Sequence, residues 1–470
     1  MALGRIRAAL ARAPVRVRVW AALAIGFLGF GVLLGAATRD ASPAAGAGAR
    51  VPLTVVLAST PTPSSTASSA GEPSAAEPEL PAVEAAPTPA PASAPAARRS
   101  PAASSTPRAG AGAPAGTERG APAPASKLPR IRHVFIVMLS DQPYASVFGP
   151  ASTASYLSRT LEGRGALLVR YDAVAHEELP NELALLSGQG PTAETAANCP
   201  TYADISPAGA AGEQVLGSGC VYPRRTRTLI DQLAAKHLSS RAYVEGIDEP
   251  GASTGPCPHP LPGQSDPTSG VEAGLGAYAT FRNPLVYFHS IVDSPACAGE
   301  DVGLARLSGD LAHAKRTPSL LYIAPDRCHD ASPVPCAAGA AAGLGPADAF
   351  LRRWVPAILA SKAYRDGGLL VITTDEAPPG GEFGDSSACC GQPPYPNLPT
   401  TTAPTGHGGG TVGALLLSPF IGHASTSQQP YNHFSLLRTI EDVFGVGHLG
   451  YAGLPAVKPF EASLFVAGRG

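Results

Sequence analysis

Residues 133–139 read HVFIVML, a run of seven residues with no acid, lysine or arginine, and Ser140 and Asp141 follow it directly. The run is almost continuously apolar and does not alternate with polar residues. A strand with one face in solvent alternates, whereas a parallel strand covered on both faces does not. The stretch therefore predicts a central strand of a parallel sheet that is covered on both sides.

Similar short apolar runs recur along the chain, and helical patterns fall between them. The further predicted strands are 166–171, 241–245, 319–323, 368–373 and 412–417. The predicted helices are 155–161, 181–186, 228–236, 347–359 and 434–444. Because strands and helices alternate, the sequence predicts an α/β fold, a three-layer sandwich with a mostly parallel central sheet.

Acids and histidines gather just after the predicted strands. In chain order these are Asp141, His176-Glu177-Glu178, Asp326, His329-Asp330 and Asp375-Glu376, and His407 precedes the last strand. Taken singly, each has an ordinary structural interpretation, as a helix cap, a turn or a solvated loop residue. Together they predict a divalent metal site, since ligands of open α/β sheets bind at the carboxyl ends of the strands. By contrast, His433 and His448 are interpreted as structural.

Several ordered stretches resemble the bacterial phosphoesterase family that contains acid phosphatases and phospholipase C-like enzymes, which have the alkaline phosphatase fold. The resemblance covers nearly all of 128–456. Its stretches are HVFIVML (133–139), LPNELALLSGQGPT (179–192), GCVYP (219–223), NPLVYFHSIVD (283–293), PDRCHD (325–330), ITTDEA (372–377), DSSACCG (385–391), GALLLSPFI (413–421) and PYNHFSLLRTIEDVFGVGHLGYA (430–452).

The resemblance implies a metal-dependent hydrolase of phosphate esters, either phosphomonoesters or phospholipid-type esters, and divalent metal ions of unknown identity as cofactors. It puts Glu178 at the position of the nucleophile and Asn181 beside it. The implied metal ligands are Asp141, Asp330, Asp375, Glu376 and His407. In the family, two divalent metals would activate the nucleophile and hold the phosphate oxygens.

Three positions depart from the family pattern. Ser140-Asp141 stands in place of Glu-Asn, Glu178 in place of a Ser or Thr nucleophile, and Ser332 in place of a His. A carboxylate cannot act as an activated hydroxyl without forming an acyl phosphate. The alternative hypothesis is therefore a catalytically lapsed phosphoesterase fold that serves as a binding module at the cell surface; a structural wall protein is a third.

The part of the chain before the predicted domain has two sections. In the first section, residues 1–40, five arginines lie within 1–18 and an uncharged run, 19–38, follows them; its 20 residues (38 − 19 + 1) suffice to cross a bilayer. The arginines precede the run, so the N-terminus is expected in the cytoplasm and the rest outside. We expect a single-pass signal anchor in the cell membrane; the alternative is a cleaved signal peptide and a secreted protein.

Residues 41–127 are rich in Ala, Pro, Ser, Thr and Gly, and no Phe, Trp or Tyr occurs between Phe30 and Phe135. Such a segment cannot bury enough apolar surface to offset its chain entropy, so we expect a disordered linker. Residues 128–470 form the phosphoesterase-like domain. The chain has 52 Gly and 50 Pro, that is 102 of 470 residues or about 22%, and the linker explains much of the Pro. A formal net charge of −2 argues against a nucleic-acid partner.

All eight cysteines lie in the predicted domain, and export would place them in an oxidising compartment. We therefore expect disulfides, with Cys328–Cys336 and Cys199–Cys220 as candidate pairs. The adjacent Cys389 and Cys390 are expected to pair with different partners. The sequence does not indicate the oligomeric state.

Overall fold

The structure of the chain is a computed structural model, and it describes residues 128–248, 255–269, 278–398, 408–422 and 424–465. The predicted anchor within 1–40 and the predicted linker 41–127 lie outside these ranges. Among the described residues, no helix is both long enough and apolar enough to span a bilayer.

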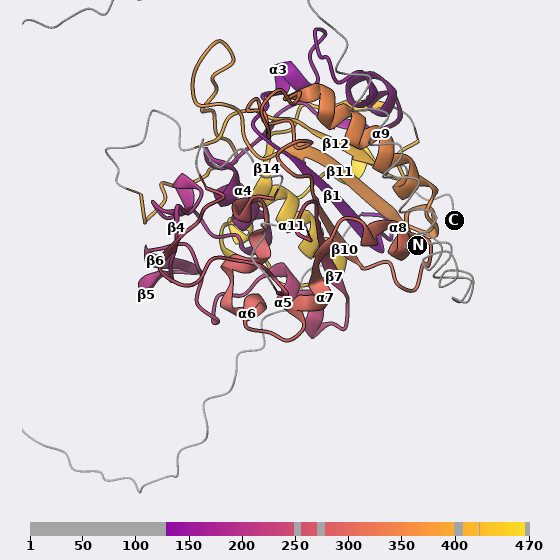
Figure 1. The fold of residues 1–470 in the computed structure, drawn as a ribbon. Helices are drawn as coiled ribbons and strands as arrows, with labels where there is room; N and C mark the ends of the chain where they lie inside the picture. The colour runs from indigo at the N-terminus through magenta and orange to yellow at the C-terminus, as the bar shows by residue number, and fades with distance from the viewer. Residues whose placement is uncertain (1–127, 249–254, 270–277, 399–407, 423, 466–470) are drawn as a thin grey trace, which may run out of the picture. The chain divides into compact units, whose positions relative to one another are not determined.

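An eight-stranded sheet forms the centre of the domain (Figure 1). Only β12 runs antiparallel to its neighbours, which confirms the predicted mostly parallel sheet. Strand β1 (His133–Leu139) has the bounds expected from the sequence and lies between β10 and β11. In spatial order the strands are β13 (Ser425–Ser427), β2 (Ala166–Leu168), β12 (Ala414–Leu417), β11 (Gly368–Thr374), β1, β10 (Leu320–Ala324), β7 (Ser240–Val244) and β9 (Asp301–Gly303).

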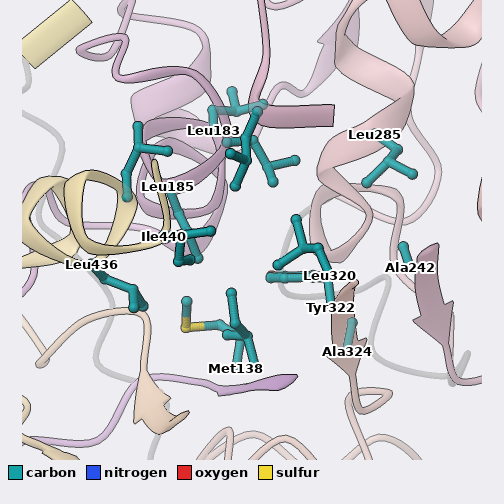
Figure 2. Packing of buried hydrophobic residues seen from close by; sticks show 14 of the residues in the cluster. Met138, Leu183, Leu185, Ala242, Leu285, Leu320, Tyr322, Ala324, Leu436 and Ile440 are labelled. Carbon is teal, nitrogen blue, oxygen red and sulfur yellow. The ribbon is translucent and has the colours of Figure 1, made fainter. Parts of the chain in front are cut away.

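Helices cover both faces of this sheet, so the domain has the three layers that the sequence predicts. Val134, Ile136 and Met138 of β1 belong to a core shared with α4 (Glu178–Ser187), α5 (Leu229–Ala235) and α11 (His433–Phe444). Figure 2 shows Met138 near Leu436 and Ile440 of α11. The intervening residues of β1, Phe135 and Val137, pack in a second core with α8 (Arg306–Leu311) and α9 (Leu344–Ala360). Successive residues of a strand point to opposite faces, which explains why an unbroken apolar run suits this position.

The predicted helices are largely confirmed, and local signals explain their ends. Helix α5 begins after Thr228, whose Oγ1 accepts the Asp231 N–H at 3.1 Å while an Asp231 carboxylate oxygen accepts the Thr228 N–H at 2.8 Å. This reciprocal pair is a capping box. The predicted helix 155–161 differs, because Tyr156–Leu161 is a single π-helical segment. Its first N–H groups are bound by the buried Asp348 carboxylate of α9 rather than by a local cap.

The predicted strand 166–171 is divided in two. Strand β2 ends at Leu168, and β3 (Tyr171–Asp172) pairs instead with β14 (Tyr431–Asn432). The other short elements are α3 (Tyr144–Val147), β4 (Thr201–Tyr202), β5 (Ser206–Ala211), β6 (Gln214–Ser218), β8 (Gln264–Ser265), α6 (His289–Val292), α7 (Cys297–Glu300) and α10 (Lys362–Arg365).

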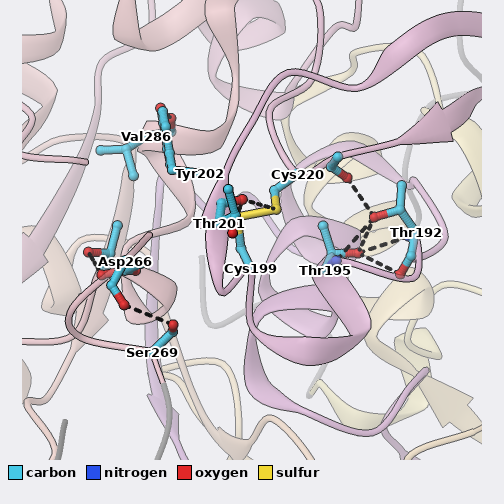
Figure 3. Close-up of a disulfide and its surroundings, with 11 residues drawn as sticks. Thr192, Thr195, Cys199, Thr201, Tyr202, Cys220, Asp266, Ser269 and Val286 are labelled. Carbon is cyan, nitrogen blue, oxygen red and sulfur yellow. Dashed lines mark hydrogen bonds between the residues drawn. A yellow bond between two sulfur atoms is a disulfide. The ribbon is translucent and has the colours of Figure 1, made fainter. Parts of the chain in front are cut away.

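All eight cysteines are paired, and the two expected pairs, Cys199–Cys220 (Figure 3) and Cys328–Cys336, are both present. A third disulfide joins Cys257 to Cys297. The prediction for Cys389 and Cys390 was wrong, because these neighbours are bonded to each other. The other six cysteines pair among themselves, so each member of the adjacent pair has only the other as a partner.

Candidate active site at the carboxyl edge of the sheet

The loops that follow three adjacent strands meet at one edge of the sheet. Ser140 and Asp141 follow β1, Asp330 lies in the loop after β10, and Asp375 and Glu376 follow β11. Backbone hydrogen bonds connect these loops: the Ser140 N–H donates to the Asp330 carbonyl at 2.6 Å, and the Asp375 N–H donates to the Leu139 carbonyl at 3.0 Å. The strand order therefore brings together acids that lie far apart in the sequence.

Glu178 is the first residue of α4 and reaches the same edge. Ser140 Oγ donates to Glu178 Oε1 at 3.2 Å, and the Asn198 side-chain amide donates to Glu178 Oε2. Asn198 Nδ2 also donates to Glu177 Oε2 at 2.9 Å, and Asn198 Oδ1 accepts the Leu179 N–H at 3.0 Å. Asn198 therefore fixes both glutamates at the helix N-terminus, where the partial positive charge of the helix favours carboxylates.

Asn181, the other predicted catalytic residue, is completely buried. Its Oδ1 accepts the N–H groups of Val174 and Ala175 at 2.8 and 3.1 Å, and its Nδ2 donates to the carbonyls of Ala175 and Glu177 at 2.7 Å. All of these partners are backbone groups. Asn181 thus shapes the loop 174–177 that presents Glu177 and Glu178.

A buried arginine lies among the acids, and the sequence reasoning missed it. Arg282 is 1% exposed. Its Nη1 is 2.8 Å from Glu182 Oε1 and forms a close ion pair with Asp375 Oδ2, and its Nε is 3.6 Å from Asp330 Oδ2. Its Nη2 donates to the Met138 carbonyl at 2.9 Å. The signal in the sequence was one charged residue inside the otherwise uncharged stretch YATFRNPLVYF (278–288).

The remaining predicted residues occupy different places. His176 Nδ1 is 3.1 Å from Glu376 Oε2, and its Nε2 is 2.8 Å from Ser386 Oγ. His329 belongs to a separate group, since its Nδ1 is 3.0 Å from both Glu245 Oε2 and Asp326 Oδ1 and possible ligand atoms of these three residues lie within 4.8 Å of one another. His407 lies outside the described residues. The glycines that follow it approach the site closely, because a side chain on Gly409 would collide with the Ala175 carbonyl.

The two residues interpreted as structural behave accordingly. His433 is fully buried, with Nδ1 2.9 Å from the Tyr171 hydroxyl and Nε2 2.8 Å from the Asp375 carbonyl oxygen. His448 Nε2 is 2.8 Å from Asp442 Oδ1. Ser332, which the resemblance aligns with a histidine, donates its N–H to Asp330 Oδ1 at 2.8 Å.

The backbone is strained where it carries these side chains. Asp141 and Glu177 have φ angles of 49° and 68°, and Asn198 and Ala331 have φ angles of 55° and 85°. Positive φ is uncommon for residues other than glycine and costs on the order of 1–3 kcal/mol at each position. Strain of this kind persists where the surrounding structure fixes the loop, and four of the nine described non-glycine residues with positive φ lie in loops around this site.

Burial, together with the charges of neighbouring carboxylates, raises the pKa values of these acids. Burial and the charges of Glu178, Glu177 and Asp330 raise the pKa of Asp141 to about 7. Burial raises the pKa of Asp330 to about 6, although Arg282 opposes the shift. Burial, with the charges of Glu178 and Asp375, also holds the pKa of Glu376 well above its usual range. Repulsion among these acids means that the site favours a bound cation.

Three of these carboxylates fit a divalent ion. Oxygens of Glu177, Glu178 and Glu376 all lie within 4.8 Å of one another. Carboxylate oxygens suit Mg²⁺, Ca²⁺ and Mn²⁺. Asp330 and Asp375 do not fit an ion in the same way, because the guanidinium of Arg282 already faces them. Within this cluster of acids, the side chains thus offer one place for a cation.

Comparison with known proteins gives one family and several structures of similar fold. The model of the Phosphoesterase family matches residues 150–447. No curated protein matches the sequence. A protein in the alkaline phosphatase superfamily from Vibrio parahaemolyticus is similar at 9% identity, with a TM-score of 0.42 and 72% of each chain covered. The lipoteichoic acid synthase LtaP from Listeria monocytogenes is similar at 10% identity, with a TM-score of 0.39 and coverage of 69% of this chain and 75% of that one. A putative sulfatase from Bacteroides thetaiotaomicron is 12% identical, with a TM-score of 0.37 and coverage of 68% and 72%.

Proposed function

The chain belongs to the phosphoesterase family, and on that premise we propose that its folded domain is a hydrolase of phosphate esters that works with one divalent cation. The observation that carries the proposal is the convergence of Glu177, Glu178 and Glu376 oxygens within 4.8 Å at the carboxyl edge of the sheet. These three side chains would hold the ion. A bound divalent cation would supply a Lewis acid for the phosphate oxygens, which the surrounding carboxylates would otherwise repel.

Glu178 determines whether phosphate is transferred to the protein or directly to water. It stands at the family's nucleophile position, is half-buried, and is held by Ser140 and Asn198. A carboxylate in this place suits a general base better than a replacement for a serine. Glu178 accepts a proton from an attacking water, the water oxygen forms the new bond to phosphorus, and the ester oxygen leaves with a proton from solvent. No phospho-enzyme forms in this scheme.

The test is turnover of a generic phosphomonoester and a generic phosphodiester by the purified full chain. The metal-free protein is assayed with Mn²⁺, Mg²⁺, Zn²⁺ or Ca²⁺. We expect turnover with at least one ion, loss of about 100-fold or more in Glu178→Gln, from the size of general-base effects, and a similar loss in Glu376→Gln. Glu162→Gln, which alters an acid outside the site, is the matched control. Wild-type rates equal to those of Glu178→Gln with every ion would refute the proposal.

A second candidate function is a binding module that holds a phosphate ester through the cation without turning it over. Two observations favour it: Glu178 replaces the hydroxyl nucleophile, and Arg282 faces the acids expected to bind metal. Under this hypothesis, the wild type binds phosphate esters in the presence of the cation but shows no turnover. Glu178→Ser then creates turnover by restoring a hydroxyl.

We also propose that the domain lies outside the cytoplasm, tethered through residues 1–40 and the linker 41–127. The pairing of all eight cysteines supports this, because structural disulfides are rare in the cytosol. Cell fractionation tests it: the anchored protein is expected in the membrane fraction and accessible to protease added outside the cell. Recovery from the culture medium would instead favour the cleaved signal peptide.

A further inference from the structure

We propose that the guanidinium of Arg282 takes the place of one divalent cation, so that the site holds a single exchangeable ion. This inference extends the proposed function, which assigns that ion to Glu177, Glu178 and Glu376. It predicts that the acids around Arg282 become a second cation site when the arginine is removed.

Arg282 is surrounded by more negative charge than it can neutralise. Glu182 Oε1 is 2.8 Å from Nη1, Asp375 contacts the same nitrogen, and Asp330 Oδ2 is 3.6 Å from Nε. One fixed positive charge therefore faces three buried carboxylates. Buried acids of this kind persist only when they are protonated or have cations among them, so a cation is favoured at this place once Arg282 is removed.

Every carboxylate oxygen of Asp330 and Asp375 faces a positive or hydrogen-bond-donating group. Asp375 Oδ1 accepts the Asp141 N–H at 3.0 Å, and Asp375 Oδ2 contacts Arg282. Asp330 Oδ1 accepts the Ser332 N–H at 2.8 Å, and Asp330 Oδ2 faces Arg282. A divalent ion at this place would have to displace the guanidinium, whose Nη2 is also hydrogen-bonded to the Met138 carbonyl.

The acids assigned to the exchangeable ion differ in their neighbours. Glu178 is bonded to the neutral donors Ser140 and Asn198, and Glu177 to Asn198. Among the described residues, no arginine or lysine forms an ion pair with Glu177, Glu178 or Glu376. One part of the site therefore contains a positive charge that belongs to the protein itself, the guanidinium of Arg282. The other part contains carboxylates that can bind an ion from solution.

The experiment measures Mn²⁺ stoichiometry by calorimetric titration of the metal-free full chain. Every protein in the series, including the wild-type reference, carries Glu245→Gln, which removes the separate group of possible ligands formed by Glu245, Asp326 and His329. We expect one ion in the wild type, two in Arg282→Gln and one in Arg282→Lys, which keeps a positive charge. Arg241→Gln is the matched control, since Arg241 forms a partly buried pair with Asp310 at 2.6 Å away from the site. We expect one ion in this variant.

Two ions in the wild type, or one in a folded Arg282→Gln, would overturn the inference. No ion in the wild type together with one in Arg282→Gln would refute the proposed cation at Glu177, Glu178 and Glu376, yet support the role of Arg282. If Arg282→Gln does not fold, crystals of the wild type soaked in Mn²⁺ decide the question. Anomalous density between Asp330 and Asp375 overturns the inference, and its absence there supports it.

Discussion

Replacing Arg282 with methionine should destabilise the domain strongly, because the change removes the charge but leaves its partners buried. Glu182, Asp330 and Asp375 are each at most 1% exposed. Breaking a buried ion pair by removing one partner costs about 3–5 kcal/mol, since a charge remains without compensation. Typical domains have a free energy of unfolding of about 5–15 kcal/mol, so the variant would lose a large part of it.

The loss should depend on pH, with a sign fixed by the raised pKa values. Burial raises the pKa of Glu182 to about 7 and that of Asp330 to about 6, even with Arg282 opposing both shifts. Without the arginine these pKa values rise further above those of the unfolded chain. The native variant then binds more protons than the unfolded chain, so its stability falls as pH rises. We expect the full loss at pH 8 and a clearly smaller loss at pH 5.

Urea unfolding in the presence of a chelator, followed by fluorescence at pH 5 and pH 8, measures both effects. Arg241→Met is the control, because its pair with Asp310 is partly exposed and should contribute less. A loss below about 1 kcal/mol at pH 8 would contradict the reasoning, given the 3–5 kcal/mol expected for a buried pair. An equal loss at both pH values would also contradict it, since the carboxylates would then not be the cause.

Three further predictions concern other buried groups. Glu441→Gln should stabilise the domain by up to about 3 kcal/mol at pH 7 but little at pH 4. Burial raises the pKa of Glu441 to about 9, and each pH unit above the usual pKa of 4.5 costs the folded wild type about 1.4 kcal/mol. Equal urea midpoints for the variant and the wild type at pH 7 would contradict this prediction. Asn181→Ala should lower the free energy of unfolding by about 2–4 kcal/mol and weaken Mn²⁺ binding at least 10-fold, because the backbone of 174–177 loses its hydrogen bonds to the Asn181 side chain. An unchanged Mn²⁺ affinity in titration would refute the positioning role of Asn181. Asp348→Ala should lower the free energy of unfolding by about 1–3 kcal/mol, because the Tyr156 and Leu157 N–H groups lose their acceptor. Mn²⁺ binding should not change. A thermal melt checks the loss of stability, and the same titration checks the Mn²⁺ affinity.

Much of the fold follows from local sequence, because burial on both faces of a strand leaves a clear pattern. The run 133–139 gave the bounds of β1, and the other predicted strands and helices were located to within a few residues, with the division of 166–171 and the π-helix at Tyr156–Leu161 as exceptions. Both exceptions depend on distant partners. Strand β3 pairs with β14, and the π-helix is capped by Asp348 from α9.

The site was only partly predictable. The strand-end rule identified acids that the structure does bring to one edge, from Asp141 to Glu376. It included Glu177 among the strand-end acids without assigning it as a ligand, and it could not identify Asn198 as the partner of Glu177, because the approach of these two residues depends on strained turns. It also missed Arg282, which follows no predicted strand and enters the site from a 3₁₀ turn at Thr280–Arg282.

The sequence by itself determined the layers, the mostly parallel sheet and the family resemblance, which implies that Glu178 stands at the nucleophile position. Only the tertiary structure decided which acids, within the part of the chain that it describes, lie together without an arginine or lysine among them and which face an arginine. The physical reason is that hydrophobic patterning is a local property of a strand or helix, whereas the electrostatics of a buried site is a sum over side chains from distant segments. Arg282, 93 residues from Asp375 in sequence, donates to a carboxylate oxygen of that aspartate.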